Sequence, residues 1–104
     1  MVLKEITEDT LPAFTNQPLA VLIFTSPWCT SCKKVISSFD ALSRELKDKV
    51  SFGTCDVSAC PSIASSFQVL SLPAVVVLKN GGEVKRFLGP VAEALMMSAL
   101  KEHL

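Results

Sequence analysis

Short apolar runs and segments of helical periodicity alternate along this chain. Residues Leu19–Thr25 are almost wholly apolar and include valine, isoleucine and phenylalanine, a composition typical of a strand covered on both faces of a parallel sheet. Residues 30–46 follow, where apolar side chains recur at helical spacing: Val35, Ile36, Phe39, Leu42 and Leu46. The pattern therefore predicts a buried strand that leads into a long amphipathic helix.

The remainder of the chain repeats this alternation and adds a hairpin. Further strands are predicted over residues 2–6, 50–57, 73–78 and 83–88. Further helices are predicted over residues 8–16, 61–67 and 91–100. Asn80-Gly81-Gly82 supplies residues that accept positive φ, so it predicts a tight turn between the last two strands. This order predicts an α/β fold, in which a central mixed sheet of about four to five strands is sandwiched by about four helices.

Composition limits the class of protein further. The 104 residues are 49% hydrophobic and carry ten basic and ten acidic side chains, which excludes a disordered chain and predicts one domain over residues 1–104. The balanced charge argues against nucleic acid or an anionic membrane as partner, and we expect a monomer. No apolar run approaches the roughly 20 residues that span a bilayer, and the N-terminus lacks a secretory signal. A cytoplasmic, reducing location is therefore expected.

Two cysteines stand where the buried strand gives way to the long helix, in the sequence Trp28-Cys29-Thr30-Ser31-Cys32. Cys29 falls at the helix N-terminus, where free backbone N–H groups and the helix dipole favour a thiolate. Cys32 lies one turn further on the same face, within bridging distance but deeper in the protein. An exposed nucleophile followed by a shielded partner is the arrangement that two-step disulfide exchange requires.

The same cysteine spacing also occurs in zinc sites, which gives an alternative interpretation. A four-thiolate site would need Cys55 and Cys60 as its second pair, and their separation lies within loose ligand spacings. The first pair, however, opens a helix rather than a knuckle loop, so redox chemistry is favoured and no metal is expected. By itself, Cys55 is most simply a small core residue.

Further motifs accompany the cysteine pair along the chain. They are Trp28-Cys29-x-x-Cys32-Lys33 after the apolar strand, Leu72-Pro73 before the valine-rich strand, Lys79-Asn80-Gly81-Gly82, and Gly89 near the last helix. Together they resemble the thioredoxin family over essentially the whole chain. The resemblance implies a thioredoxin fold and a thiol–disulfide oxidoreductase, which exchanges a Cys29–Cys32 dithiol or disulfide with protein disulfides in electron transport and cell redox homeostasis.

The resemblance also implies roles for individual residues. Cys29 is then the attacking thiol and Cys32 the resolving thiol of a redox-active disulfide. A cis peptide bond between Leu72 and Pro73 would present the backbone to an extended substrate segment. The implied substrate-binding residues are Trp28, Leu72, Pro73 and Gly89. No cofactor is expected, because the dithiol carries the electrons, and the family implies a thioredoxin reductase or an equivalent electron donor as partner.

Several positions depart from the family pattern. Thr30-Ser31 stands where thioredoxins usually have Gly-Pro, and its hydroxyls can donate hydrogen bonds to a Cys29 thiolate, which would make the disulfide a stronger oxidant. Ile23 occupies the place of the family's buried carboxylate, and Ser37 that of the proline that bends the long helix. Thr30-Ser31 and Ile23 are also consistent with an alternative function, a thioredoxin-like binding or scaffold module with a dedicated partner.

One further thiol has a counterpart in the family. Cys60 lies in the polar loop Ser58-Ala59-Cys60-Pro61 and is similar to an accessory cysteine of some thioredoxins. The sequence leaves two interpretations of it, a regulatory thiol or a spectator.

Overall fold

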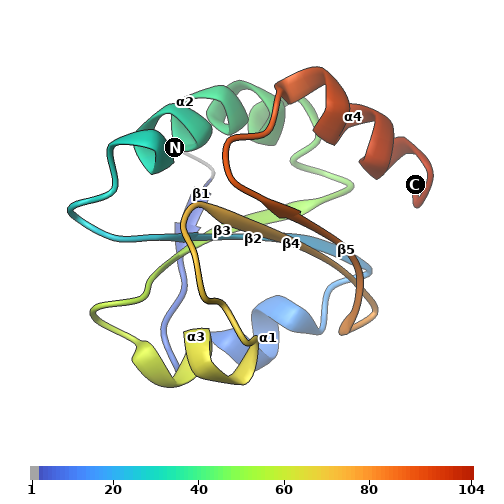
Figure 1. Cartoon of the computed structure of the whole chain (residues 1–104). Helices are drawn as coiled ribbons and strands as arrows, with labels where there is room; N and C mark the ends of the chain where they lie inside the picture. The colour runs from blue at the N-terminus through green and yellow to red at the C-terminus, as the bar shows by residue number, and fades with distance from the viewer. Residues whose placement is uncertain (1–2) are drawn as a thin grey trace.

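Five strands form one mixed sheet with the order β1-β3-β2-β4-β5 in the computed structural model, which describes residues 3–104 (Figure 1). The strands are β1 (Leu3–Glu5), β2 (Leu19–Thr25), β3 (Ser51–Asp56), β4 (Ala74–Lys79) and β5 (Gly82–Leu88). β1, β3 and β2 run parallel, whereas β4 is antiparallel to both of its neighbours. The predicted mixed sheet is confirmed, and β1 lies at its edge. Val2, included in the predicted first strand, lies outside the described residues.

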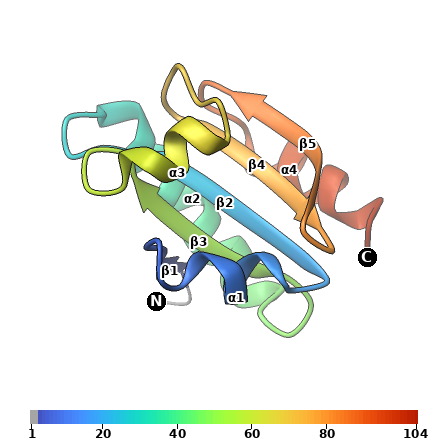
Figure 2. The ribbon, with the colours of Figure 1, turned by 90° about the horizontal axis from the view of Figure 1, so that it is seen from below.

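Helices cover both faces of this sheet. α2 (Thr30–Glu45) and α4 (Glu93–Lys101) lie on one face, and α1 (Leu11–Thr15) and α3 (Pro61–Ser66) lie on the other (Figures 1 and 2). The predicted α/β sandwich is therefore confirmed. Within residues 3–104, no helix combines the length and the apolar character needed to cross a bilayer.

The central strand β2 shows how an uninterrupted apolar sequence is used in this fold. Alternate side chains of a strand point to opposite faces of the sheet. The core under α2 and α4 contains Leu19, Val21 and Ile23. The core under α1 and α3 contains Ala20, Leu22 and Phe24. All of these side chains are at most 3% exposed, so β2 is anchored from both sides and holds the residues that follow it at one end of the sheet.

The first helix is shorter than the predicted residues 8–16. Thr10 Oγ1 accepts a hydrogen bond from the backbone N–H of Thr7 at 2.9 Å, which stabilises a turn before the helix. α1 begins only at Leu11, and Pro12 lies in its first turn, where a backbone N–H is not needed. The threonine turn therefore replaces the first turn of the predicted helix.

The last helix differs from the prediction in its start and in its buried face. α4 begins at Glu93, while Val91 packs against the core from the preceding segment. Met96 and Leu100 are fully buried, whereas Leu95, which fits an apolar helical face by its spacing, is 55% exposed. A helix of nine residues presents only a narrow stripe to the sheet, and residues four apart define that stripe.

The hairpin turn between β4 and β5 forms where the sequence predicts it. Asn80 and Gly81 have φ values of 51° and 86°, the left-handed conformation that asparagine and glycine tolerate. Gly82 already belongs to β5 and has no positive φ. Of the three residues predicted to form the turn, only Asn80 and Gly81 therefore adopt the positive φ that it requires.

Candidate active site

The connection between β2 and α2 brings the two motif cysteines together at one end of the sheet. A disulfide joins Cys29 and Cys32, whose Cα atoms are 5.3 Å apart. Cys29 is the N-cap residue of α2, and its Sγ accepts a hydrogen bond from the backbone N–H of Cys32 at 3.2 Å. The helix therefore begins at the pair, and its first N–H groups lie where they stabilise negative charge on Cys29.

The two cysteines differ in exposure although one bond joins them. Cys32 is fully buried, and its Sγ lies 3.9 Å from the carbonyl oxygen of Phe24 in β2. Cys29 is partly exposed, and the neighbouring Trp28 is 78% exposed. A large molecule can therefore reach the sulfur of Cys29 directly, whereas Cys32 is accessible only to a sulfur already attached at Cys29.

The start of β4 lies beside the cysteine pair. Ala74 is the register partner of Phe24, whose carbonyl oxygen contacts Cys32. The Leu72–Pro73 peptide bond immediately before Ala74 is cis, as the resemblance implies. The sheet thus holds the cis-proline segment next to the disulfide.

Gly89 fixes the other side of this segment. Its backbone N–H donates a hydrogen bond to the carbonyl oxygen of Pro73 at 2.8 Å. Its φ is +81°, and a Cβ added here would meet no atom within 4 Å. Glycine is therefore favoured at this position by backbone conformation, and the space beside it is open.

The hydroxyls of Thr30 and Ser31, which the sequence places near Cys29, lie in different surroundings. Ser31 Oγ lies 3.7 Å from Cys29 Sγ. Thr30 is exposed, and its hydroxyl makes no hydrogen bond to any of residues 3–104. Ile23 is fully buried in the apolar core under α2, so this position offers packing and no proton acceptor. Ser31 is thus the hydroxyl whose geometry suits an interaction with the sulfur.

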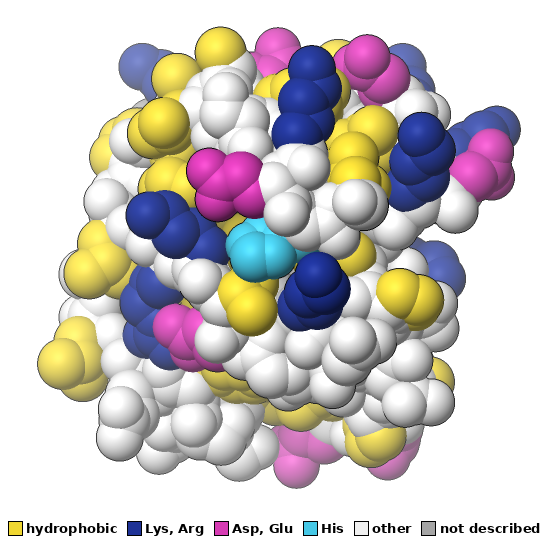
Figure 3. Space-filling model, turned by 90° about the vertical axis from the view of Figure 1, so that its right-hand side faces the viewer, with side chains coloured by type: hydrophobic (Ala, Val, Ile, Leu, Met, Phe, Trp, Pro, Cys, Tyr) yellow, Lys and Arg dark blue, Asp and Glu magenta, His cyan; other side chains and the backbone are white. Residues whose placement is uncertain are grey.

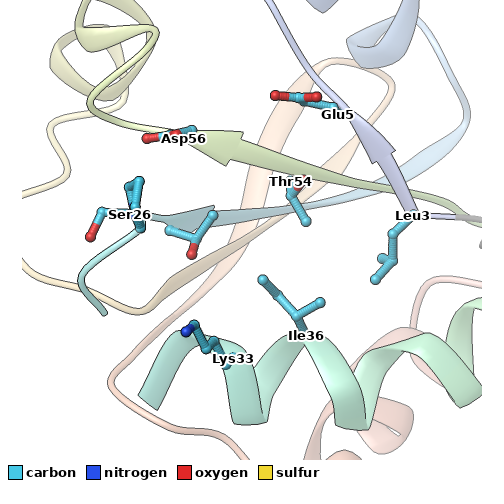
Figure 4. Close-up of a pocket in the computed structure, with 9 residues that line it drawn as sticks. Leu3, Glu5, Ser26, Lys33, Ile36, Thr54 and Asp56 are labelled. Carbon is cyan, nitrogen blue, oxygen red and sulfur yellow. The ribbon is translucent and has the colours of Figure 1, made fainter. Parts of the chain in front are cut away.

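A pocket of about 440 Å³ lies next to the start of α2 (Figure 4). Lys33 and Ile36 of α2 lie opposite Thr54 of β3 across this pocket, with Glu5 and Asp56 on its rim. Neither motif cysteine lines it. Sequence reasoning did not anticipate this pocket, because its walls come from elements that are distant along the chain.

The other two cysteines are free thiols in the core under α1 and α3. Cys55 is fully buried, as predicted, and burial together with the nearby Cys60 and Asp56 raises the pKa of its thiol to about 11. Cys60, predicted in a polar loop, is only 8% exposed, because it is the N-cap residue of α3 and packs inward with that helix. No three His, Cys, Asp or Glu side chains form a metal-binding group within the described part of the chain.

The end of the molecule that carries the C-terminus has a different character (Figure 3). Basic and acidic side chains are interspersed on this face. His103, the only histidine, lines a hollow of about 360 Å³ together with Lys49 and Lys79. No residue of the cysteine motif lines this hollow. The imidazole of His103 is therefore not a base for either motif thiol.

After reduction of the disulfide, iodoacetamide is expected to label Cys29 well before the other thiols. Cys32 and Cys55 are fully buried, and Cys55 also stays protonated near neutral pH because its pKa is raised to about 11. Peptide mass mapping after a short exposure measures the order. Labelling in urea should make the four thiols similar, and faster labelling of Cys32 than of Cys29 in the folded protein would contradict the prediction.

Disulfide exchange needs one sulfur within reach of a large molecule and a second sulfur directly behind it. This fold presents that pair at a helix N-terminus, which defines the chain as a thiol–disulfide oxidoreductase. The family model Thioredoxin matches residues 3–102, and the chain belongs to the thioredoxin family.

Individual relatives agree with this assignment. The chain is 34% identical over 89 residues to a thioredoxin of Echinococcus granulosus, a match that covers 85% of this chain and 82% of the relative. It is 27% identical over 104 residues to a thioredoxin of Bacillus subtilis, and that match covers 100% of both chains. A solved structure of Malassezia sympodialis thioredoxin has a TM-score of 0.87 at 26% identity, and the alignment covers 97% of this chain and 90% of that one.

Proposed function

We propose that this chain reduces protein disulfides with Cys29 as the attacking thiol and Cys32 as the resolving thiol. The difference in exposure across one disulfide carries the proposal, since Cys29 is partly exposed and Cys32 is fully buried. The backbone N–H groups at the start of α2 favour the thiolate of Cys29. The nucleophile is therefore the sulfur that a substrate can reach.

The reaction proceeds by two successive thiol–disulfide exchanges. The Cys29 thiolate attacks one sulfur of the substrate disulfide, a mixed disulfide forms, and the other substrate sulfur leaves as a thiolate that takes up a proton. Cys32 then loses its proton and attacks Cys29 Sγ. The Cys29–Cys32 bond forms while the second substrate sulfur leaves and is protonated, so two electrons pass from the dithiol to the substrate.

The proposed substrate-binding surface surrounds the accessible sulfur. Its residues are Trp28, Leu72, Pro73 and Gly89. An extended segment of the substrate would pair with the backbone at Leu72, in the manner of strand addition. The exposed indole of Trp28 and the open space beside Gly89 support this arrangement.

Each turnover leaves the Cys29–Cys32 bond oxidised, so an electron donor has to reduce it. Thioredoxins receive electrons from thioredoxin reductase, and we propose such a reductase or an equivalent donor as the partner of this chain. A relative from Mycobacterium leprae is a bifunctional thioredoxin reductase/thioredoxin; the match is 30% identical over 88 residues and covers 85% of this chain and 19% of the relative.

We also propose the substrate class, the oligomeric state and the cellular location that go with this chemistry. Ten acidic and ten basic residues support a protein substrate over nucleic acid or an anionic membrane. We propose a single thioredoxin-like domain over residues 1–104 that acts as a monomer in the cytoplasm, where reducing conditions keep free thiols such as Cys55 and Cys60 reduced.

Reduction of insulin by dithiothreitol tests the proposed function. The wild-type chain should accelerate the precipitation of the released insulin B chain, and Cys29→Ser should show only the rate of dithiothreitol alone. Cys60→Ser serves as the matched control, because it also removes one thiol but one that lies outside the site. A wild-type rate no faster than dithiothreitol alone would contradict the proposal and favour a binding module.

A further inference from the structure

The segment of residues 67–72 connects α3 to the cis-proline that precedes β4 (Figure 2). At its start, Arg86 Nη2 donates a hydrogen bond to the carbonyl oxygen of Phe67 at 2.6 Å, and Nη1 donates to that of Gln68 at 3.4 Å. At its end, the N–H of Gly89 donates to the carbonyl oxygen of Pro73 at 2.8 Å. Arg86 of β5 and Gly89, directly after β5, thus bond to the two ends of the connection.

The guanidinium of Arg86 is itself held in place by Glu83 on the same strand. Arg86 Nε and Nη2 each lie 2.8 Å from a different carboxylate oxygen of Glu83, which is a bidentate pair. The hydrogen bond from Arg86 holds the pKa of the Glu83 carboxyl below its usual value, so the pair is fully charged near neutral pH. The side chain therefore has a fixed orientation before it meets the segment.

Backbone hydrogen bonds and core packing also hold the start of the segment. The backbone N–H groups of Gln68 and Val69 bond back to the carbonyl oxygens of Ser65 and Ala64, which closes α3 with Gln68 in the left-handed conformation at φ 55°. Arg86 is the donor to the carbonyl oxygens of Phe67 and Gln68. Leu70 is 96% exposed, whereas Phe67, Val69 and Leu72 pack against the core under α1 and α3. Arg86 therefore adds a polar anchor at the start of the segment to this apolar packing.

We propose that Arg86, oriented by Glu83, is a positioning residue for protein substrates: it fixes the start of the segment of residues 67–72, which leads to the backbone of Leu72 beside the cysteine pair. This inference rests on the proposed function. A polypeptide substrate meets this segment when it binds, whereas a small disulfide meets only the accessible sulfur of Cys29. Arg86 touches no reacting atom, so it acts on substrate binding and not on the exchange chemistry.

Arg86→Gln tests the inference by comparing two substrates in one variant. The kcat/KM for insulin should fall about tenfold, which corresponds to about 1.4 kcal/mol, through a higher KM. The rate with hydroxyethyl disulfide and the reduction potential of the cysteine pair should stay at the wild-type values. Arg44→Gln is the matched control, since it breaks an arginine–carboxylate pair with Asp40 in α2, 2.7 Å long, that contacts no part of the segment.

Glu83→Gln examines the same contact without removing the guanidinium. It should lower kcat/KM for insulin by about threefold, because the guanidinium remains but loses the charged partner that orients it. Far-ultraviolet circular dichroism of each variant checks that the fold is kept. An equal loss with insulin and with hydroxyethyl disulfide, or no loss with insulin in either variant, overturns the inference while leaving the proposed function intact. A wild-type chain that reduces neither substrate overturns both.

Discussion

Replacing Cys32 with serine is expected to give a protein that attacks disulfides but remains covalently attached to its substrate. The accessible sulfur of Cys29 forms the mixed disulfide as before, because its position at the start of α2 does not depend on the thiol of Cys32. The second exchange cannot occur, since a serine hydroxyl does not displace a thiolate from sulfur. Turnover with insulin should fall to the rate of dithiothreitol alone, and intact mass spectrometry should show the chain plus one substrate thiol.

The control for this trapping experiment is the double variant Cys29→Ser, Cys32→Ser. It retains the buried thiols of Cys55 and Cys60 and should form no adduct, because neither sulfur is accessible. Dithiothreitol should release the adduct of the single variant. An adduct in the double variant, or one that peptide mapping places on Cys60, would show that the reactive sulfur has been misassigned.

Ser31→Ala is expected to make the cysteine pair more reducing, by about 30 mV or tenfold in the equilibrium with glutathione. Ser31 Oγ lies 3.7 Å from Cys29 Sγ, and in the reduced state it can donate a hydrogen bond to the thiolate. A hydrogen bond to a thiolate is stronger than one to a disulfide sulfur, so it stabilises the reduced form more and raises the potential. A hydrogen bond to a charged group contributes about 1.5–3 kcal/mol, and partial exposure reduces that to the value expected here. Equilibration against a series of glutathione buffers measures the shift.

Thr30→Ala is the matched control for Ser31→Ala. It also removes one hydroxyl from the motif, but the Thr30 side chain is exposed and makes no contact with the sulfur within residues 3–104. Its potential should equal that of the wild type. A similar change in both variants would assign the effect to the general polarity of the loop, and an unchanged potential in Ser31→Ala would show that this hydroxyl does not tune the pair.

Local sequence signals were sufficient for the elements that position the site. The run Leu19–Thr25 is polar only at its last position, which favours a strand covered on both faces, and its first six residues are buried. The helix Thr30–Glu45 falls within the predicted helical residues 30–46, and the cysteine pair lies at the junction of these two elements. Strand, helix and junction all follow from residues close together along the chain.

Features that depend on contacts between distant parts of the chain could not be predicted from the sequence. Leu95 fits an apolar helical face by spacing, but the sheet covers only the stripe of Met96 and Leu100. Cys60 lies among polar neighbours, yet the start of α3 turns it into the core. Arg86 contacts carbonyl groups 18 and 19 positions earlier in the chain. Each outcome is decided by which element packs where, and no pattern of neighbouring residues encodes that.

The exposed indole of Trp28 gives this molecule an intrinsic optical reporter. The chain has one tryptophan and no tyrosine, so its ultraviolet-excited emission comes almost entirely from the position next to Cys29. That indole is 78% exposed and directly precedes the sulfur that forms and breaks bonds. Oxidation, mixed-disulfide formation and docking of a partner over the site therefore all change the surroundings of a single fluorophore. Stopped-flow fluorescence can follow each of these steps in the unlabelled wild-type chain.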